Sequence, residues 1–350
     1  MAYTTIKKPS LYFNTKLYTG NGSDATAITG VGFQPDFTWI KERSQTRSHV
    51  LFDSIRGVTQ QLNSNDSASE ATVASSLQAF DSNGFTVGTA TSVNQNNETY
   101  ASWNWKAGTT GSGTTTGSGT GKAYTYSVNT TSGLSIVNFL GNGTSGHTIP
   151  HHLGAAPNVV LLKNRSDGEE WRCGHTSQSS NFSKGLHLST NATQWTQTGA
   201  FNDTAPSSTV FTVGNFNSTN GDGDNIIAYC FTEKVGYSKF GKYIGTNHSN
   251  GPFNYCGFKP AWLLIKSTTY AGNWLMFDNK RELKNIASGN PINANETGGE
   301  SANANYAIDF LSNGFKLRNT NGNIQNSGET MVFMAFAAEP LVGDNPATAQ

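Results

Sequence analysis

One phrase, written three times, constrains the fold of this chain more than any other feature of its sequence. Residues 32–41, 154–163 and 257–266 each read Gly-x-x-Pro, one further residue, an apolar run and a lysine. Repetition at a long period is the signature of architectures built from similar structural units. The chain is therefore predicted to contain three related units, and such scaffolds present surfaces more often than a single catalytic pocket.

Two further landmarks recur in the same order after each phrase. A Phe-centred segment lies roughly 50 to 55 residues after the proline, at Phe85, Phe211 and Phe315, and a strand combining alanine with aromatic residues follows it. A looser landmark, Gly20-Asn21-Gly22 and its counterparts at 141–143 and 245–247, has the composition of a hairpin turn. The predicted division is repeat 1 at 1–106, a linker at 107–122, repeat 2 at 123–235, repeat 3 at 236–340 and a flexible tail at 341–350.

The fold class follows from short runs rich in Val, Ile, Phe, Tyr and Trp, separated by clusters of Asn, Gly, Ser and Thr. Only residues 67–80 have a composition that a helix could use. The chain is predicted to be all-β, with three tandem β-sandwich units of jelly-roll or concanavalin-like type.

The segment 107–122 is a run of Gly, Ser and Thr with almost no apolar side chain. Such composition predicts a flexible linker between the first two repeats. Repeats 2 and 3 are joined without a linker, so we expect them to pack together more rigidly.

Composition excludes several classes of function. Lys plus Arg equals Asp plus Glu at 23 each, so no net field favours nucleic acid or an anionic membrane. No apolar stretch is long enough to span a bilayer, and the start lacks a signal-peptide core. The three cysteines form no metal or disulfide pattern, and Cys230 lies in an apolar run typical of a buried thiol. We expect synthesis in the cytoplasm without membrane insertion.

No catalytic constellation is evident. Aspartates 53, 81, 278 and 309 are the carboxylates that could serve glycoside cleavage, but nothing in the sequence marks a pair. Asp53 and Asp278 each precede an arginine by three residues, which favours a structural turn stabilised by an ion pair between the two side chains. Repeat 2 lacks this aspartate–arginine spacing and has Arg172, His175 and Lys184 in the corresponding region instead. The chain is predicted to be non-enzymatic and to use no cofactor.

Two weak ligand candidates remain. Asp222 and Asp224 alternate in a Gly- and Asn-rich loop as calcium ligands do, but the rest of a calcium loop is missing, so a turn is favoured over a metal site. The adjacent pair His151 and His152 has a residue type that often binds metal ions, but neighbours on a strand point to opposite faces, so both cannot easily serve one ion. An exposed loop pair is the simpler interpretation.

The tryptophans divide by position. Those inside the repeated strands are expected in the core. Trp171, Trp195 and Trp274 lie between the landmarks, in segments that differ among the repeats. Aromatic rings in amide-rich loops can stack on sugars, so these three, with His151 and His152, are the candidates for contact with a glycan or a protein partner. The alternative is that each ring packs against its own domain.

Several of these phrases resemble a known family. The chain looks like the tandem-repeat structural proteins of marine tailed phages, including cyanophages, in residues 8–15, 18–22, 32–35, 39–41, 83–88 and 251–258. The resemblance implies concanavalin-like β-sandwiches in a virion protein without a defined activity.

The leading hypothesis is a tail-fibre or receptor-binding component that contacts host-surface glycans. The alternatives are a capsid decoration or head-fibre protein and, third, a depolymerase of surface polysaccharide. The expected partners are other virion proteins, further copies of the chain in a homo-oligomer (a trimer being favoured), and host carbohydrate. The expected location is the virion.

Overall fold

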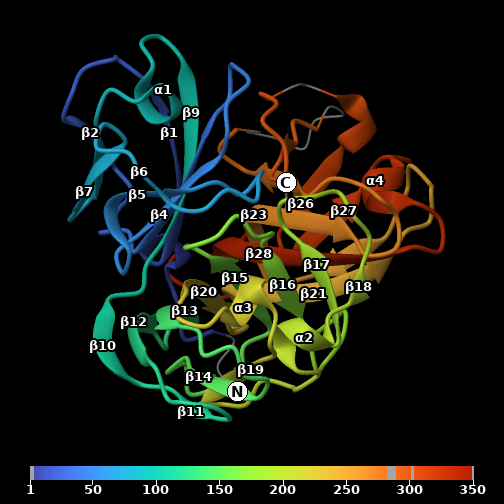
Figure 1. Cartoon of the computed structure of the whole chain (residues 1–350). Coiled ribbons are helices and arrows are strands. Elements are labelled where there is room, and N and C mark those ends of the chain that lie inside the picture. The colour runs from blue at the N-terminus through green and yellow to red at the C-terminus, as the bar shows by residue number, and fades with distance from the viewer. Residues whose placement is uncertain (1–3, 282–288, 301–302, 349–350) are drawn as a thin grey trace.

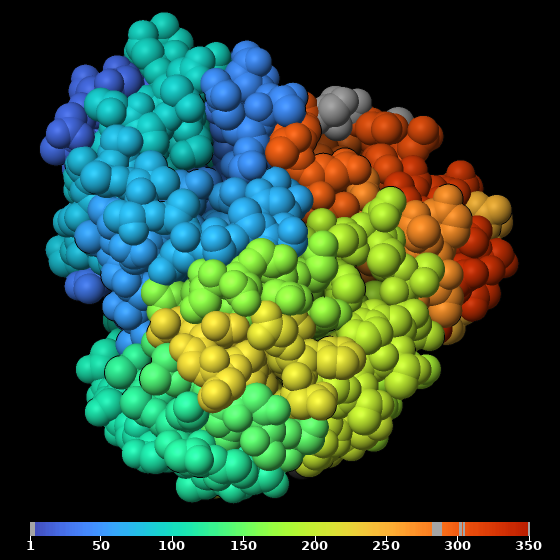
Figure 2. Space-filling model, in the orientation of Figure 1, coloured from blue at the N-terminus to red at the C-terminus, as the bar shows by residue number. Residues whose placement is uncertain are grey.

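Antiparallel sheets make up nearly all of the regular structure. The computed structural model describes residues 4–281, 289–300 and 303–348. Strand accounts for 44% of the chain and helix for 6%, and six sheets are present within the described residues. The predicted all-β class is confirmed. The sheets form three lobes around a common centre, drawn blue, green to yellow, and orange to red (Figures 1 and 2).

Lobe 1 has a six-stranded sheet in the order β1-β9-β3-β4-β5-β6 and a three-stranded sheet in the order β2-β8-β7. Its elements are η1 (Pro9–Leu11), β1 (Phe13–Thr19), β2 (Thr26–Thr29), β3 (Phe37–Glu42), β4 (Val50–Asp53), β5 (Gly57–Leu62), β6 (Ala71–Thr72), β7 (Leu77–Asp81), β8 (Gly84–Val87), α1 (Thr91–Asn94) and β9 (Thr99–Trp105).

Lobe 2 has an eight-stranded sheet, β10-β12-β13-β20-β15-β16-β17-β18, and a three-stranded sheet, β11-β14-β19. Its elements are β10 (Thr109–Thr114), β11 (Thr116–Gly117), β12 (Ala123–Asn129), β13 (Leu134–Leu140), β14 (His147–Pro150), β15 (Val159–Asn164), β16 (Arg172–His175), β17 (Lys184–His187), β18 (Trp195–Thr196), α2 (Thr198–Phe201), β19 (Val210–Val213), α3 (Asn217–Asn220) and β20 (Asn225–Phe231).

Lobe 3 has a five-stranded sheet, β21-β28-β23-β24-β25, and a three-stranded sheet, β22-β27-β26. Its elements are β21 (Ser238–Ile244), β22 (Phe253–Tyr255), β23 (Phe258–Ser267), β24 (Leu275–Asp278), β25 (Ile292–Asn293), η2 (Ala304–Tyr306), β26 (Ile308–Leu311), β27 (Gly314–Leu317), α4 (Gly322–Gln325) and β28 (Thr330–Pro340). Among the described residues, no helix is long and apolar enough to cross a bilayer.

The three copies of the repeated phrase occupy the same place in their sheets. Their apolar runs form β3, β15 and β23, which pair with the alanine–aromatic strands β9, β20 and β28 respectively. Each run is buried along its whole length, as expected for strands covered on both faces. This shared position supports the predicted relation between the copies, while their division into three independent units remains a prediction.

Each lobe has its own core between its two sheets, and a fourth core lies where the lobes meet. The central core draws on the opposite faces of all three large sheets. It includes Trp39 and Trp103 of lobe 1, Tyr229 of lobe 2, and Trp262 and Phe336 of lobe 3. Because lobe 1 contributes as fully as the others, the lobes share one apolar interior, and the expectation that repeats 2 and 3 associate more closely gains no support.

The predicted linker is built into lobe 2. Strand β10 pairs with β12, which places Gly111 beside Tyr126 and Gly113 beside Tyr124. A Cβ atom would lie 2.6 Å from the facing tyrosine hydroxyl at Gly111 and 2.8 Å from it at Gly113. The glycines therefore allow the strand to lie flat over the tyrosines, and the low apolar content reflects this close approach and not flexibility.

Two local expectations also change. Residues 67–80 contain β6 and the start of β7 instead of a helix. The Gly-Asn-Gly turns do use positive φ, at Gly22 (69°), Gly143 (67°) and Asn247 (50°). However, they carry the chain from one sheet to the other, β1 to β2 in lobe 1, and do not close a hairpin.

Candidate functional site

The candidate residues Trp171 and Trp274 are buried and connect neighbouring lobes, and they are not surface aromatics. Each immediately precedes the strand beside the repeated phrase, and both indoles are buried, at 0% and 2% exposure. Trp171 Nε1 donates to the carbonyl of Asn63 in lobe 1 at 2.8 Å, and Trp274 Nε1 donates to the carbonyl of His187 in lobe 2 at 2.7 Å. Burial with a satisfied N–H is the usual state of a core tryptophan.

His49 completes the set. It immediately precedes β4, as Trp171 precedes β16 and Trp274 precedes β24, and its Nε2 lies 3.0 Å from the carbonyl of Asn293 in lobe 3. In each case the acceptor carbonyl lies at, or directly after, the end of a strand of the neighbouring lobe, namely β5, β17 or β25. Lobe 2 contacts lobe 1, lobe 3 contacts lobe 2, and lobe 1 contacts lobe 3. The joint is cyclic.

The aspartate–arginine steps form a second set of joints. Asp53 Oδ2 lies 2.5 Å from Arg56 Nε and also accepts a hydrogen bond from Tyr229 of lobe 2 at 2.6 Å. Asp278 Oδ2 lies 2.6 Å from Arg281 Nε and accepts from Trp103 Nε1 of lobe 1 at 3.0 Å.

These carboxylates are at most 1% exposed and also cap the following turn, since Asp53 Oδ1 and Asp278 Oδ1 accept backbone N–H groups. Burial raises the pKa of Asp278, but the Arg281 guanidinium beside it outweighs that effect and holds the pKa below its ordinary value. The predicted structural turn is correct, and each turn also binds a second lobe.

A glutamate extends each of these ion pairs to the neighbouring lobe. Glu70 contacts Arg56 at 3.0 Å and Arg165 of lobe 2 at 2.5 Å. Glu300 contacts Arg281 at 3.8 Å and Arg43 of lobe 1 at 2.5 Å. The lobe 1–lobe 2 and lobe 3–lobe 1 boundaries therefore each contain an Asp–Arg–Glu–Arg chain.

The boundary between lobes 2 and 3 has neutral residues at the matching positions. His175 lies opposite Val159 as Asp53 lies opposite Phe37, and its Nε2 is 3.2 Å from the carbonyl of Phe333. Three residues on, Gln178 bonds Gln194 at 3.0 Å. Of the residues that the sequence offered for repeat 2, His175 holds the aspartate position, whereas Arg172 and Lys184 do not.

The histidine pair is separated by its surroundings. His151 is fully buried, with Nε2 3.1 Å from the carbonyl of Ser207, and burial lowers its pKa to about 4. His152 is partly exposed at φ 58°; its ring stacks on Tyr126 at 3.8 Å and its Nε2 lies 3.0 Å from the Tyr124 hydroxyl. The structure thus places only His152 at the surface, and it is held within lobe 2.

The aspartate loop closes a turn. Asp222 pairs with Lys122 at 3.0 Å, and Asp224 accepts from Asn164 at 2.8 Å, with Gly223 between them at φ 79°. Within the part of the chain that the structure describes, no three His, Cys, Asp or Glu side chains are grouped as a metal site would need. All three thiols are free and buried, as expected for Cys230.

Trp195 is the one tryptophan of the seven that is not buried. It lies on β18, the last strand of the eight-stranded sheet. Its indole stacks on Phe216 with an interplanar angle of 9°, and the Arg172 guanidinium carbon lies 4.7 Å from the ring centre. Arg172 Nη1 also contacts His187 Nε2 at 2.5 Å.

These four residues, Arg172, His187, Trp195 and Phe216, are called the Trp195 cluster below; all are partly exposed. The cluster combines a flat apolar ring with cationic and imidazole donors, an arrangement suited to a neutral or acidic sugar. Burial lowers the pKa of His187 to about 4, and Arg172 beside it adds to the effect, so His187 is neutral near pH 7. Sequence reasoning found Trp195 but not its partners, because 172, 187 and 216 come together only when three strands and a loop meet.

Comparison with known proteins adds a family without an assigned function. A family model described as "Domain of unknown function (DUF7483)" matches residues 8–340. No curated protein and no solved structure matches the chain significantly.

Proposed function

We propose that this chain, which belongs to the DUF7483 family, is a non-catalytic structural protein of a phage virion that contacts host-surface glycans. The observation that carries the proposal is the Trp195 cluster. Six of the seven tryptophans are buried, and the remaining one lies at an open sheet edge beside Arg172. The resemblance of the repeated phrases to phage structural proteins supports the location in a virion.

The positions of the aspartates support a binding role over glycoside cleavage. Asp53 and Asp278 are buried in separate lobe boundaries and are engaged by Arg56 and Arg281. Asp81 accepts from the Thr86 hydroxyl, and Asp309 pairs with Arg318. A glycosidase needs two carboxylates facing one bond, whereas each of these four is engaged by a different residue.

The rigid centre suits a protein that presents a surface. All three lobes share one core, and ion pairs and hydrogen bonds fix their relative positions. A surface held in this way loses little conformational entropy on binding, so weak individual contacts with a sugar remain useful.

The test uses the purified full chain and surface polysaccharide extracted from a marine cyanobacterium. Binding is measured by calorimetry for the wild type, for Trp195→Ala and for Tyr255→Ala, which removes an exposed aromatic elsewhere. We expect Trp195→Ala to weaken binding at least tenfold, about the contribution of one stacked ring, and Tyr255→Ala to leave it unchanged. Equal loss in both variants, or release of reducing ends from the polysaccharide, would contradict the proposal.

A reconstruction of phage particles tests the location. A fibre or attachment protein should appear at the tail in few copies. Hundreds of copies on the shell would favour a capsid decoration role instead.

A further inference from the structure

Strand β1 has an open edge that its counterpart in lobe 2 lacks. β1 pairs with β9 over seven residues, and no strand among the described residues pairs with its other side. β13 holds the same place in lobe 2 and pairs with β20 on one side. Its other side is covered by β12, which β10 covers in turn. Lobe 2 therefore shows what fits along this edge: an antiparallel strand.

The pairing registers show which residues of β1 correspond to which residues of β13. Thr15 lies opposite Trp103 and Ile136 lies opposite Tyr229, so Thr15 and Ile136 hold matching positions. In lobe 2, β12 places Ser127 beside Ile136 and Tyr126 beside the next residue, Val137. A strand added to β1 in the same way would place its Ser127 equivalent beside Thr15 and its Tyr126 equivalent beside Lys16.

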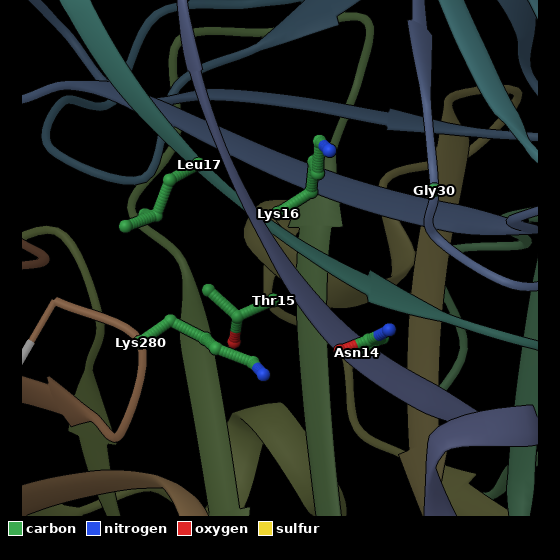
Figure 3. A pocket seen from close by; sticks show the side chains of 6 residues that line it. All are labelled: Asn14, Thr15, Lys16, Leu17, Gly30 and Lys280. Atoms are coloured by element: carbon green, nitrogen blue, oxygen red, sulfur yellow. The ribbon is translucent and has the colours of Figure 1, made fainter. Parts of the chain in front are cut away.

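A hollow of about 300 Å³ lies at this place. It is lined by residues 14–17 of β1, by Gly30 and by Lys280 of lobe 3, which reaches toward the strand (Figure 3). Gly30 directly follows β2, as His151 directly follows β14 in lobe 2. There the next residue, His152, stacks on Tyr126 of β12. The hollow beside β1 is thus the space that β12 fills in lobe 2.

The lining of the hollow is cationic. Lys16 and Lys280 contribute two ammonium groups that have no ion-pair or hydrogen-bond partner among the described residues, and no carboxylate lines the hollow. Thr15 is 6% exposed, and its hydroxyl is buried without a partner. In an antiparallel strand, alternate residues turn their backbone N–H and C=O groups to the open side. The hollow therefore offers ladder hydrogen bonds, one unmet hydroxyl and positive charge.

We propose that the open edge of β1 binds an extended strand of another polypeptide, which adds antiparallel to the sheet and carries an Asp or Glu opposite Lys16. Main-chain bonds would supply affinity and the carboxylate would supply specificity. A second copy of β1 is a poor occupant, because antiparallel pairing of the full strand Phe13–Thr19 with its copy places the central Lys16 opposite Lys16, and like charges on an edge oppose self-association. The site is independent of the Trp195 cluster.

The probe is a peptide copying Ala123–Asn129 with the change Tyr126→Glu, added to the full-length chain. Amide hydrogen exchange of residues 13–19 is the measurement, and residues 134–140 of the covered strand β13 are the internal reference. We expect at least tenfold slower exchange of alternate amides in β1 and no change in β13. Two control peptides, one with Tyr126→Lys and one N-methylated on the edge-facing amides, should give no protection.

Charge reversal in the protein supplies the matched variant. Lys16 is partly exposed, so Lys16→Glu should fold normally, lose protection by the glutamate peptide and gain protection by the lysine peptide. Protection that survives N-methylation, or absence of protection at millimolar peptide, would overturn the proposal. So would protection by glucuronate alone, which would identify an acidic-sugar site. Trp195→Ala should leave peptide binding unchanged. The peptide proposal and the glycan proposal can therefore fail independently of each other.

Discussion

The hydroxyl of Tyr229 on β20 donates to Asp53 on β4 at 2.6 Å, through the same carboxylate oxygen that lies 2.5 Å from Arg56 Nε. One buried oxygen thus joins a turn of lobe 1 to a strand of lobe 2. The matching contact, from Trp103 to Asp278, joins lobe 1 to lobe 3. These contacts hold the sheets together as one molecule, because the Tyr229 hydroxyl and the Trp103 indole N–H are satisfied by a carboxylate of a neighbouring lobe.

Removing either partner of the Asp53–Tyr229 contact should destabilise the protein unequally. Asp53→Asn removes one of the two carboxylates that pair with the buried Arg56 guanidinium, leaving only Glu70, and should cost about 3 kcal/mol. Tyr229→Phe removes one hydroxyl while Arg56 still pairs with Asp53, and should cost about 1–2 kcal/mol. Urea unfolding at pH 7 measures both, and the double variant gives the coupling. A cost for Tyr229→Phe equal to that of Asp53→Asn would show that the hydroxyl, and not the ion pair, dominates.

The neutral boundary between lobes 2 and 3 can be tested by introducing charge. His175→Asp places a carboxylate where no arginine lies three residues on, so we expect a loss of roughly 3 kcal/mol or more in unfolding free energy. Gln178→Arg, added to His175→Asp, restores the step found in lobes 1 and 3 and should recover at least half of that loss. Gln178→Arg alone is the control and should not stabilise. Thermal unfolding separates these outcomes.

Stability should fall as the pH drops from about 6.5 to about 4. Burial lowers the pKa of His175 to about 4, while the same histidine in the unfolded chain titrates near 6.5. The unfolded state therefore binds the extra proton in this window, and the linked loss reaches roughly 3 kcal/mol for this one group. His175→Gln should have a shallower pH dependence than the wild type in urea unfolding from pH 7.5 to 4. Parallel curves would mean that folding does not lower the pKa of His175.

Strand β10 should detach when its glycines are replaced. Gly111→Val adds a side chain whose Cβ would lie only 2.6 Å from the Tyr126 hydroxyl, so the segment 107–122 should become accessible to limited proteolysis. Ser112→Val, on the opposite and exposed face of the same strand, should remain resistant. Rapid cleavage of the wild-type chain within 107–122 would instead favour the flexible linker that composition suggested.

Sequence patterns identified what depends on local chemistry. The strands, the repeated phrase and the buried thiol of Cys230 follow from side-chain type and alternation, which act over a few residues. The aspartate–arginine turn was also predictable, because both partners lie within one turn. The segment 67–80, whose composition a helix could use, forms strands instead: Thr72 lies in β6, which pairs with β5, and Leu77 begins β7, which pairs with β8, so strand pairing outweighs weak helix propensity.

The candidate site was predictable only in part. Trp195 was named with Trp171 and Trp274, since all three lie in segments that differ among the repeats. The structure separates them by what surrounds each indole. Trp171 and Trp274 donate to carbonyls of other lobes, whereas Trp195 stacks on Phe216 at an open edge. No spacing within one repeat reports on a partner 87 or 108 residues away.

The sequence alone determined that this chain is all-β, because strand periodicity and turn composition depend on residues close together in the chain. Tertiary structure alone decided that Lys41 would be buried against Thr297, that Gly111 would lie on Tyr126, and that β1 would keep an open edge while β13 would not. The reason is physical: a strand's second edge and second face are filled by whatever segment comes next in space, and that neighbour is set by the packing of whole sheets around the shared core.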